Sequence, residues 1–168
     1  IDVETYRGHI RITPLGRVDE TKLRIVAATL QTFFNLAADV DPPLISFQTT
    51  RISPGNQLHA GHLLERLSEG LEKNDKRLGV TDQDITLPFL NYVYGEAQIG
   101  GQTAVVSSFR LKTDSDEHHQ NESLLYERIA KVALHETGHL LGFSHCRVKG
   151  CIMNFSIGLS FLDRLELR

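Results

Sequence analysis

The chain has 168 residues, of which 40% are hydrophobic and 23% are charged, and its formal net charge is −3. This length and composition predict one globular domain that buries about two-thirds of the surface of its unfolded state. The interspersed charges give no basic field for nucleic acid and no polybasic segment for a membrane surface, and the chain has no run of about eighteen apolar residues that could span a bilayer.

From these features we expect neither a nucleic-acid partner nor a membrane partner. The first residues of the chain are too polar for the core of a signal peptide, which favours a cytoplasmic location. We also expect a monomer. Two cysteines do not make a disulfide framework.

Alternating strand-like and helix-like blocks fill the first half of the chain. Residues 9–16 alternate in polarity and stop at a Pro/Gly signal, which predicts a strand. Asp19 can cap a helix that ends near Asn35, with apolar residues at three- and four-residue spacing. A second strand is predicted from Leu44 to the turn at 53–55, and a second helix from about Asn56 into the charged stretch 72–77.

The second half of the chain begins with strand-like segments and ends in a long helix. Residues 80–87, 91–98 and 102–111 read as strands, and the Gly100-Gly101 turn predicts a hairpin between the last two. A polar loop at 113–120 leads to a helix from about Asn121 to Leu141. The order of elements predicts an α/β fold with a mostly parallel sheet and one antiparallel hairpin at its edge.

The long helix ends in the segment HETGHLLGFSH, at residues 135–145. His135 and His139 lie on one helix face and can direct two nitrogens at one zinc ion, while Glu136 stands beside them as a candidate general base. Gly142 can adopt a left-handed conformation that ends the helix and lets His145 return as the third ligand.

Three protein ligands leave a fourth coordination position open for water, which distinguishes a catalytic zinc site from a structural one. Such a water can lose a proton near neutral pH and attack a carbonyl carbon. The alternative, a solvated helix face that carries two histidines by chance, is much less consistent with the five matching positions. The motif therefore predicts a catalytic zinc, held by His135, His139 and His145.

The extended zinc motif, followed by Met153 in the turn Cys151-Ile152-Met153-Asn154-Phe155, resembles the metzincin clan of metallopeptidases. Cys146 directly follows the third histidine and Cys151 comes five residues later, which resembles the archaemetzincin family in particular. The resemblance implies a twisted five-stranded sheet, a backing helix and an active-site helix. It also implies a division at about residue 142 into an N-terminal part (1–142) and a C-terminal part (143–168) that carries the Met-turn.

In archaemetzincins these two cysteines and a later CxxC pair hold a second, structural zinc. The CxxC pair would lie beyond Arg168, and the second zinc requires it. Cys146 and Cys151 are therefore half of such a site, two reduced thiols, or a disulfide. Met153 would form an apolar floor beneath the imidazoles. The resemblance further implies that Asn91, Tyr92, Val93, Tyr94, Gly95, Glu96, Ala97 and Gln98 form the edge strand along which the substrate backbone lies. An ordinary edge strand covered by a loop is the alternative.

The predicted function is a zinc-dependent metallopeptidase, endopeptidase or aminopeptidase, that acts on a peptide or protein substrate. Glu136 would take a proton from the zinc-bound water and return it to the leaving amine. The competing hypothesis is a zinc-containing peptide-binding protein with little or no turnover.

Overall fold

The computed structural model describes residues 8–45, 51–52, 55–112, 122–154 and 158–167. A five-stranded sheet in the order β2-β1-β5-β8-β7 runs through the molecule. Its strands are β1 (His9–Leu15), β2 (Ala37–Val40), β5 (Arg77–Thr81), β7 (Gly95–Ala97) and β8 (Thr103–Ser107). All neighbouring pairs are parallel except β7 with β8, which is antiparallel. The expected α/β fold, a mostly parallel sheet with one antiparallel edge strand, is therefore confirmed.

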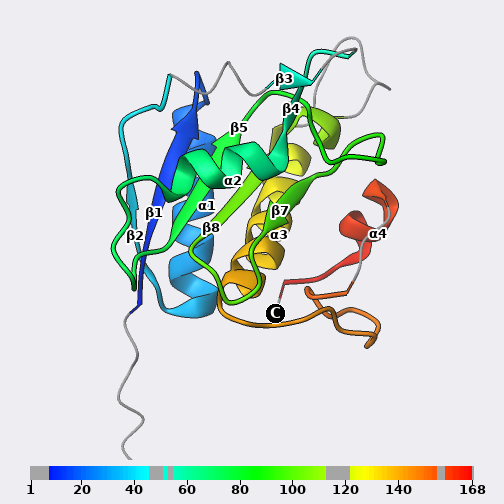
Figure 1. Cartoon of the computed structure of the whole chain (residues 1–168). Coiled ribbons are helices and arrows are strands. Elements are labelled where there is room, and N and C mark those ends of the chain that lie inside the picture. The colour runs from blue at the N-terminus through cyan, green and yellow to red at the C-terminus, as the bar shows by residue number, and fades with distance from the viewer. Residues whose placement is uncertain (1–7, 46–50, 53–54, 113–121, 155–157, 168) are drawn as a thin grey trace, which may run out of the picture.

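Helices cover both faces of this sheet. Helices α1 (Glu20–Phe34) and α3 (Glu122–Leu140) lie on one face, and α2 (Ala60–Ser68) lies on the other (Figure 1). Strand β8 shows why both faces are apolar: Ala104 and Val106 belong to the core on the α1 and α3 side, whereas Val105 belongs to the core under α2. The central strands are thus buried on both faces, as expected for parallel strands.

The predicted bounds of the first helix agree with its local capping. The Asp19 carboxylate accepts a hydrogen bond from the Thr21 backbone N–H at 3.2 Å, which satisfies one of the donors that a helix N-terminus leaves open. At the other end Asn35 has a left-handed conformation with φ of 52°. The predicted first strand and first helix are both confirmed.

The second predicted strand is right only at Arg51–Ile52, which form the strand β3, and it is wrong in its start. The strand that follows α1 is β2, at Ala37–Val40, and Leu44 makes only an isolated bridge with Leu15. Residues 46–50 and 53–54, which the prediction also included, lie outside the described residues. Residues 37–40 are mostly exposed, so no apolar pattern marked them as a strand. They are held by parallel pairing with β1, which a local pattern cannot reveal.

A second, three-stranded sheet was not predicted. It consists of β3 (Arg51–Ile52), β4 (Gln57–His59) and β6 (Ile85–Thr86). Because β4 occupies residues 57–59, α2 begins at Ala60, later than predicted, and it ends at Ser68, before the charged stretch. The predicted strand at 80–87 is split in two, since β5 ends at Thr81 and β6 joins the other sheet.

The remaining differences between prediction and structure lie in the second half of the chain. The predicted strand at 91–98 is shorter in the structure, where β7 covers only Gly95–Ala97. After β8 the chain forms a 3₁₀ turn at Phe109–Leu111 and, near the C-terminus, the helix α4 at Leu159–Arg164. In the described part of the chain, no helix is both long and apolar enough to cross a membrane.

Candidate metal centre

The metal-binding motif lies on the last turns of α3 and on the chain that follows. Gly142 has a φ of 95°, a left-handed conformation that an L side chain rarely adopts. Its N–H donates to the carbonyl of His139 at 2.9 Å, and the Phe143 N–H donates to the carbonyl of Gly138 at 3.0 Å. These two bonds form a Schellman motif, which ends the helix and satisfies two of its open carbonyl groups. The chain then turns back toward the helix.

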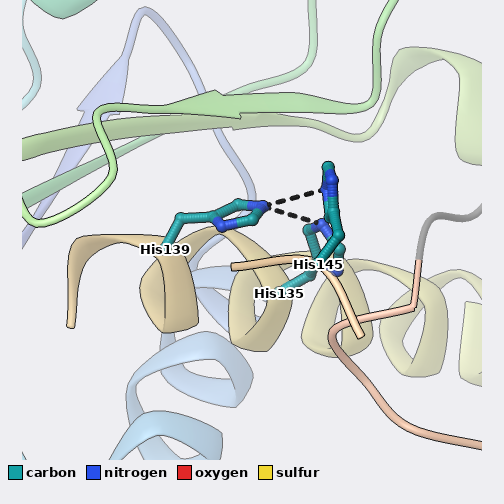
Figure 2. Close-up of side chains that lie close together, drawn as sticks. All are labelled: His135, His139 and His145. Atoms are coloured by element: carbon teal, nitrogen blue, oxygen red, sulfur yellow. Dashed lines mark hydrogen bonds between the residues drawn. The ribbon is translucent and has the colours of Figure 1, made fainter. Parts of the chain in front are cut away.

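This turn brings the third histidine to the other two. Figure 2 shows the rings of His135 and His139 from α3 and of His145 from the following segment pointing toward one another. The Nε2 atom of His139 lies 3.1 Å from Nε2 of His135 and 3.2 Å from Nε2 of His145. The three nitrogen ligand atoms all lie within 4.8 Å of one another.

Backbone carbonyls fix the tautomer of the first two rings. The Nδ1–H of His135 donates to the carbonyl of Ile152 at 2.7 Å, and the Nδ1–H of His139 donates to the carbonyl of Phe143 at 2.8 Å. Each Nε2 therefore presents a lone pair in the neutral ring. Burial lowers the pKa of both histidines, which also favours the neutral form that a metal ion requires.

A zinc ion fits this arrangement. Two unprotonated nitrogens 3.1 Å apart repel each other unless a cation lies between them. Tetrahedral zinc with nitrogen ligands at about 2.0–2.1 Å separates neighbouring ligand atoms by about 3.3 Å, close to the observed spacing. Three imidazoles also match the ligand set of catalytic zinc sites, which retain an open position. The sequence could not name the carbonyl groups of Ile152 and Phe143, because a backbone acceptor has no signature in residue type.

Glu136 lies beside the three histidines in the same cavity. The cavity has a volume of about 470 Å³ and is lined by β7, α3 and the C-terminal segment. Only 7% of Glu136 is exposed. Burial, together with the nearby Glu96 carboxylate, raises the pKa of Glu136 to about 8. A cation bound by the histidines would favour the ionised form of this carboxyl group.

Strand β7 lies directly against Glu136. A methyl group added at Gly95 would come within 2.6 Å of Glu136 Cγ and 2.8 Å of its Oε1. Glycine at this position therefore gives the carboxylate the space in which it lies. Of the residues predicted for the edge strand, Tyr92, Val93, Tyr94, Gly95, Glu96 and Ala97 line the cavity.

The turn that contains Met153 packs beneath α3. A methyl group added at Gly138 would meet the Met153 sulfur at 2.4 Å, so the thioether lies against the helix backbone between the first two histidine turns. The Met153 carbonyl accepts from the Cys146 N–H at 2.8 Å, and the preceding carbonyl, that of Ile152, holds His135. This turn thus contacts both segments that carry the histidines, the helix through His135 and the following segment through Cys146.

Cys146 and Cys151 lie on the loop between His145 and this turn. Both are free thiols, partly exposed, and they interact with each other. The Val148 N–H donates to Cys146 Sγ at 3.4 Å. The two thiols are near enough to affect each other's charge, and among the described residues no further cysteine, histidine or carboxylate joins them in a metal-binding group.

The comparison with known proteins agrees with the metal-binding motif. The model of a family described as Peptidase family M54 matches residues 64–166. The chain belongs to peptidase family M54. Over 95% of its length it is 30% identical to an archaemetzincin from Haloarcula marismortui, of which it covers 93%. It is 32% identical to an archaemetzincin from Methanocaldococcus jannaschii over 95% of this chain and 87% of the relative.

Solved structures that are similar to this chain have the same fold. The archaemetzincin from Archaeoglobus fulgidus, complexed with malonate, has a TM-score of 0.79 and 34% identity, covering 93% of this chain and 91% of that chain. A zinc-dependent peptidase from Methanocorpusculum labreanum also has a TM-score of 0.79, with 26% identity and 92% coverage of both chains. Family membership makes this chain a zinc metallopeptidase of the archaemetzincin type, as the sequence predicted.

Proposed function

We propose that this archaemetzincin hydrolyses peptide bonds with zinc held by His135, His139 and His145 and with Glu136 as the general base. The observation that carries the proposal is the convergence of three Nε2 atoms beside a buried carboxyl group in one cavity. Three neutral ligands and an adjacent base are the parts that metal-assisted hydrolysis needs.

The protein side chains have distinct tasks in this mechanism. When bound, zinc supplies a Lewis acid and lowers the pKa of a coordinated water. Glu136 accepts a proton from the attacking water and then donates a proton to the amine that leaves. The carbonyl groups of Ile152 and Phe143 keep two imidazoles in orientation, and Met153 gives the histidine rings an apolar floor.

The substrate backbone would extend the sheet at β7. This strand is at the edge of the five-stranded sheet and lines the cavity next to Glu136. Backbone N–H and C=O groups on a free strand edge can pair with an extended peptide. Of the predicted segment Asn91 to Gln98, residues 95–97 have strand geometry, so we assign the pairing to these residues.

Replacement of the general base tests this mechanism. We expect Glu136→Gln to reduce kcat/KM about 10²- to 10⁴-fold, because general acid–base catalysis contributes about that factor. The variant should retain its zinc, since none of the ligands changes. Hydrolysis of a diverse peptide library, with zinc measured in the same sample, gives both quantities.

The matched control is Glu127→Gln, which changes an exposed carboxylate on the same helix and should leave hydrolysis intact. If the zinc-loaded protein binds peptides but cleaves none of them, the competing function, a zinc-containing peptide-binding protein, replaces the proposed one.

The second zinc site is a separate proposal. Cys146 and Cys151 lie together and would form half of it. Zinc counted per chain of the full-length protein decides between the two interpretations: two equivalents support a second site, and one equivalent leaves Cys146 and Cys151 as reduced thiols. The division at residue 142, the monomeric state and the cytoplasmic location stay predictions.

A further inference from the structure

A buried cation lines the same cavity. Lys131 lies on α3 one helical turn before His135 and therefore shares its face of the helix. It is 4% exposed and lines the cavity together with Val132 and Leu162. The ammonium group thus lies where α3 meets α4.

Among the residues that the structure describes, Lys131 has few partners for a buried charge. Its Nζ donates to the carbonyl of Leu162 at 2.8 Å, whereas an ammonium group has three donors. Asp163 is near enough to be affected by its charge, but both carboxylate oxygens of Asp163 accept hydrogen bonds from Arg128 at 2.7 Å. Within the described residues, no carboxylate forms an ion pair with Lys131.

The direction of β7 shows which part of a substrate would reach this lysine. Tyr94, just before β7, is within electrostatic range of Arg128, Gly95 lies against Glu136, and the Gly100 N–H donates to the His139 carbonyl at 2.8 Å. The strand and the turn after it therefore run in the same direction as α3. A peptide antiparallel to β7 runs the opposite way, so residues that follow the scissile bond lie toward Lys131.

We propose that Lys131 is a specificity residue that recognises a carboxylate on the residue directly after the scissile bond. The carboxylate is an Asp or Glu side chain, or the free C-terminus of a substrate that ends there. This inference rests on the proposed function, because it takes the cleavage position and the pairing with β7 from it. The antiparallel direction of the peptide is part of the present proposal.

The cost of burying the lysine supports this role over a purely structural one. Removing an ammonium group from water costs several kcal/mol, and one hydrogen bond to a carbonyl group offsets only a small part of that cost. An apolar side chain could fill the space between α3 and α4 without that cost. A substrate carboxylate that completes the hydrogen bonding of the ammonium would offset part of the cost during binding.

The other charges of the cavity confine the preference to one position. Glu96 and Glu136 also line it, and each disfavours a second carboxylate nearby. An acidic substrate residue therefore binds more tightly than a neutral one only at the position where its carboxylate reaches Lys131. The preference should not extend to positions before the scissile bond.

Paired peptides test the proposal with zinc-loaded protein. One set compares Glu with Gln at each position around the cleaved bond, with amidated C-termini. A second set compares a free with an amidated C-terminus on the residue directly after the bond. We expect kcat/KM to favour the carboxylate about ten- to a hundredfold in one of the two sets, the range for a hydrogen bond to a charged group.

Lys131→Met keeps an unbranched stem in place and removes the charge, so this ratio should fall to about one. The matched control is Lys76→Met. Lys76 is a partly buried lysine that also donates to backbone carbonyls, those of Gly101 and Leu140, but it does not line the cavity, and its variant should keep the ratio.

A wild-type ratio near one in both peptide sets overturns the proposal, whether or not Lys131→Met folds. Binding of the same peptides to zinc-loaded Glu136→Gln protein gives a readout that needs no turnover. If no peptide is cleaved but the carboxylate peptides still bind about tenfold more tightly than their neutral counterparts, the proposed hydrolysis is rejected and the proposed role of Lys131 in binding is supported. Equal affinities reject the role of Lys131 in the absence of any activity.

Discussion

At the scale of single residues, two glycines set how closely other segments approach the metal-binding helix. Gly138 makes room for the Met153 sulfur beneath the helix, and Gly95 makes room for Glu136 above it. Neither contact requires a left-handed conformation, because no positive φ occurs at these two positions. A larger side chain at either position would therefore act by steric displacement, not by backbone strain.

Gly138→Ala should destabilise the protein. Its methyl group would meet the Met153 sulfur at 2.4 Å, and forcing extra volume into a packed site costs about 1–3 kcal/mol. Alanine regains up to about 1 kcal/mol of helix propensity, so we expect a net loss of about 1–2 kcal/mol in the free energy of unfolding. Chemical denaturation measures this loss. Gly158→Ala is the control, since nothing lies within 4 Å of its added methyl group; equal stability of the two variants would contradict the predicted contact.

Gly95→Ala should impair catalysis more than stability. The new methyl group would displace the Glu136 carboxylate, and a general base misplaced by about 1 Å can cost about a hundredfold in rate. Zinc binding should be unchanged, because none of the three histidines is touched. Steady-state kinetics and zinc content together check this prediction, and unchanged kcat/KM would show that the strand can move aside.

At the scale of elements, an ion pair between Arg128 and Asp163 links α3 to α4. The Arg128 guanidinium, whose side chain is 4% exposed, donates two hydrogen bonds of 2.7 Å to Asp163 and a third to the Leu111 carbonyl. The two-pronged geometry matches the planar guanidinium to the carboxylate. The pair keeps the C-terminal helix next to the cavity that α4 helps to line.

Asp163→Asn should cost about 1.5–3 kcal/mol of unfolding free energy at neutral pH, because it removes the partner of a buried charge. The hydrogen bonds from Arg128 lower the pKa of Asp163 below its ordinary value of 3.8. The wild-type advantage is therefore present above about pH 4 and is lost as the pH falls through the lowered pKa. Denaturation of both proteins across this range checks the sign. Glu20→Gln, in an exposed pair with Arg24, should change stability by less than about 0.5 kcal/mol.

At the scale of the whole molecule, zinc should contribute to stability. The three ligands come from the helix and from the segment after it, so a bound ion would link both to one centre. Zinc at about 100 times its Kd adds about 2.7 kcal/mol, which raises Tm by about 5–10 °C in a chain of this size. Thermal denaturation with and without a chelator measures the shift. His145→Gln should reduce it and His9→Gln, on β1, should not; an unchanged Tm on zinc removal would contradict the prediction.

Sequence alone determined the elements whose signals are local. The capped helix from Glu20 to Phe34 and the metal-bearing helix could be predicted because their apolar spacing and end signals lie within one segment. The spacing of the three histidines is also a local signal, since a helix places residues four apart on one face and Gly142 ends the helix. The family resemblance and the nature of the metal followed from that segment.

Only the tertiary structure decided features that depend on a distant partner. Strand β2 forms through pairing with β1 despite its exposed residues. Strand β6 pairs with β4 in the second sheet and does not belong to the five-stranded one. The same holds at the site, where the Ile152 carbonyl orients His135, Gly95 touches Glu136 and Lys131 meets the chain of α4. Such contacts join residues up to about forty positions apart in sequence, and a local pattern fixes the conformation of each segment but not which segment it meets.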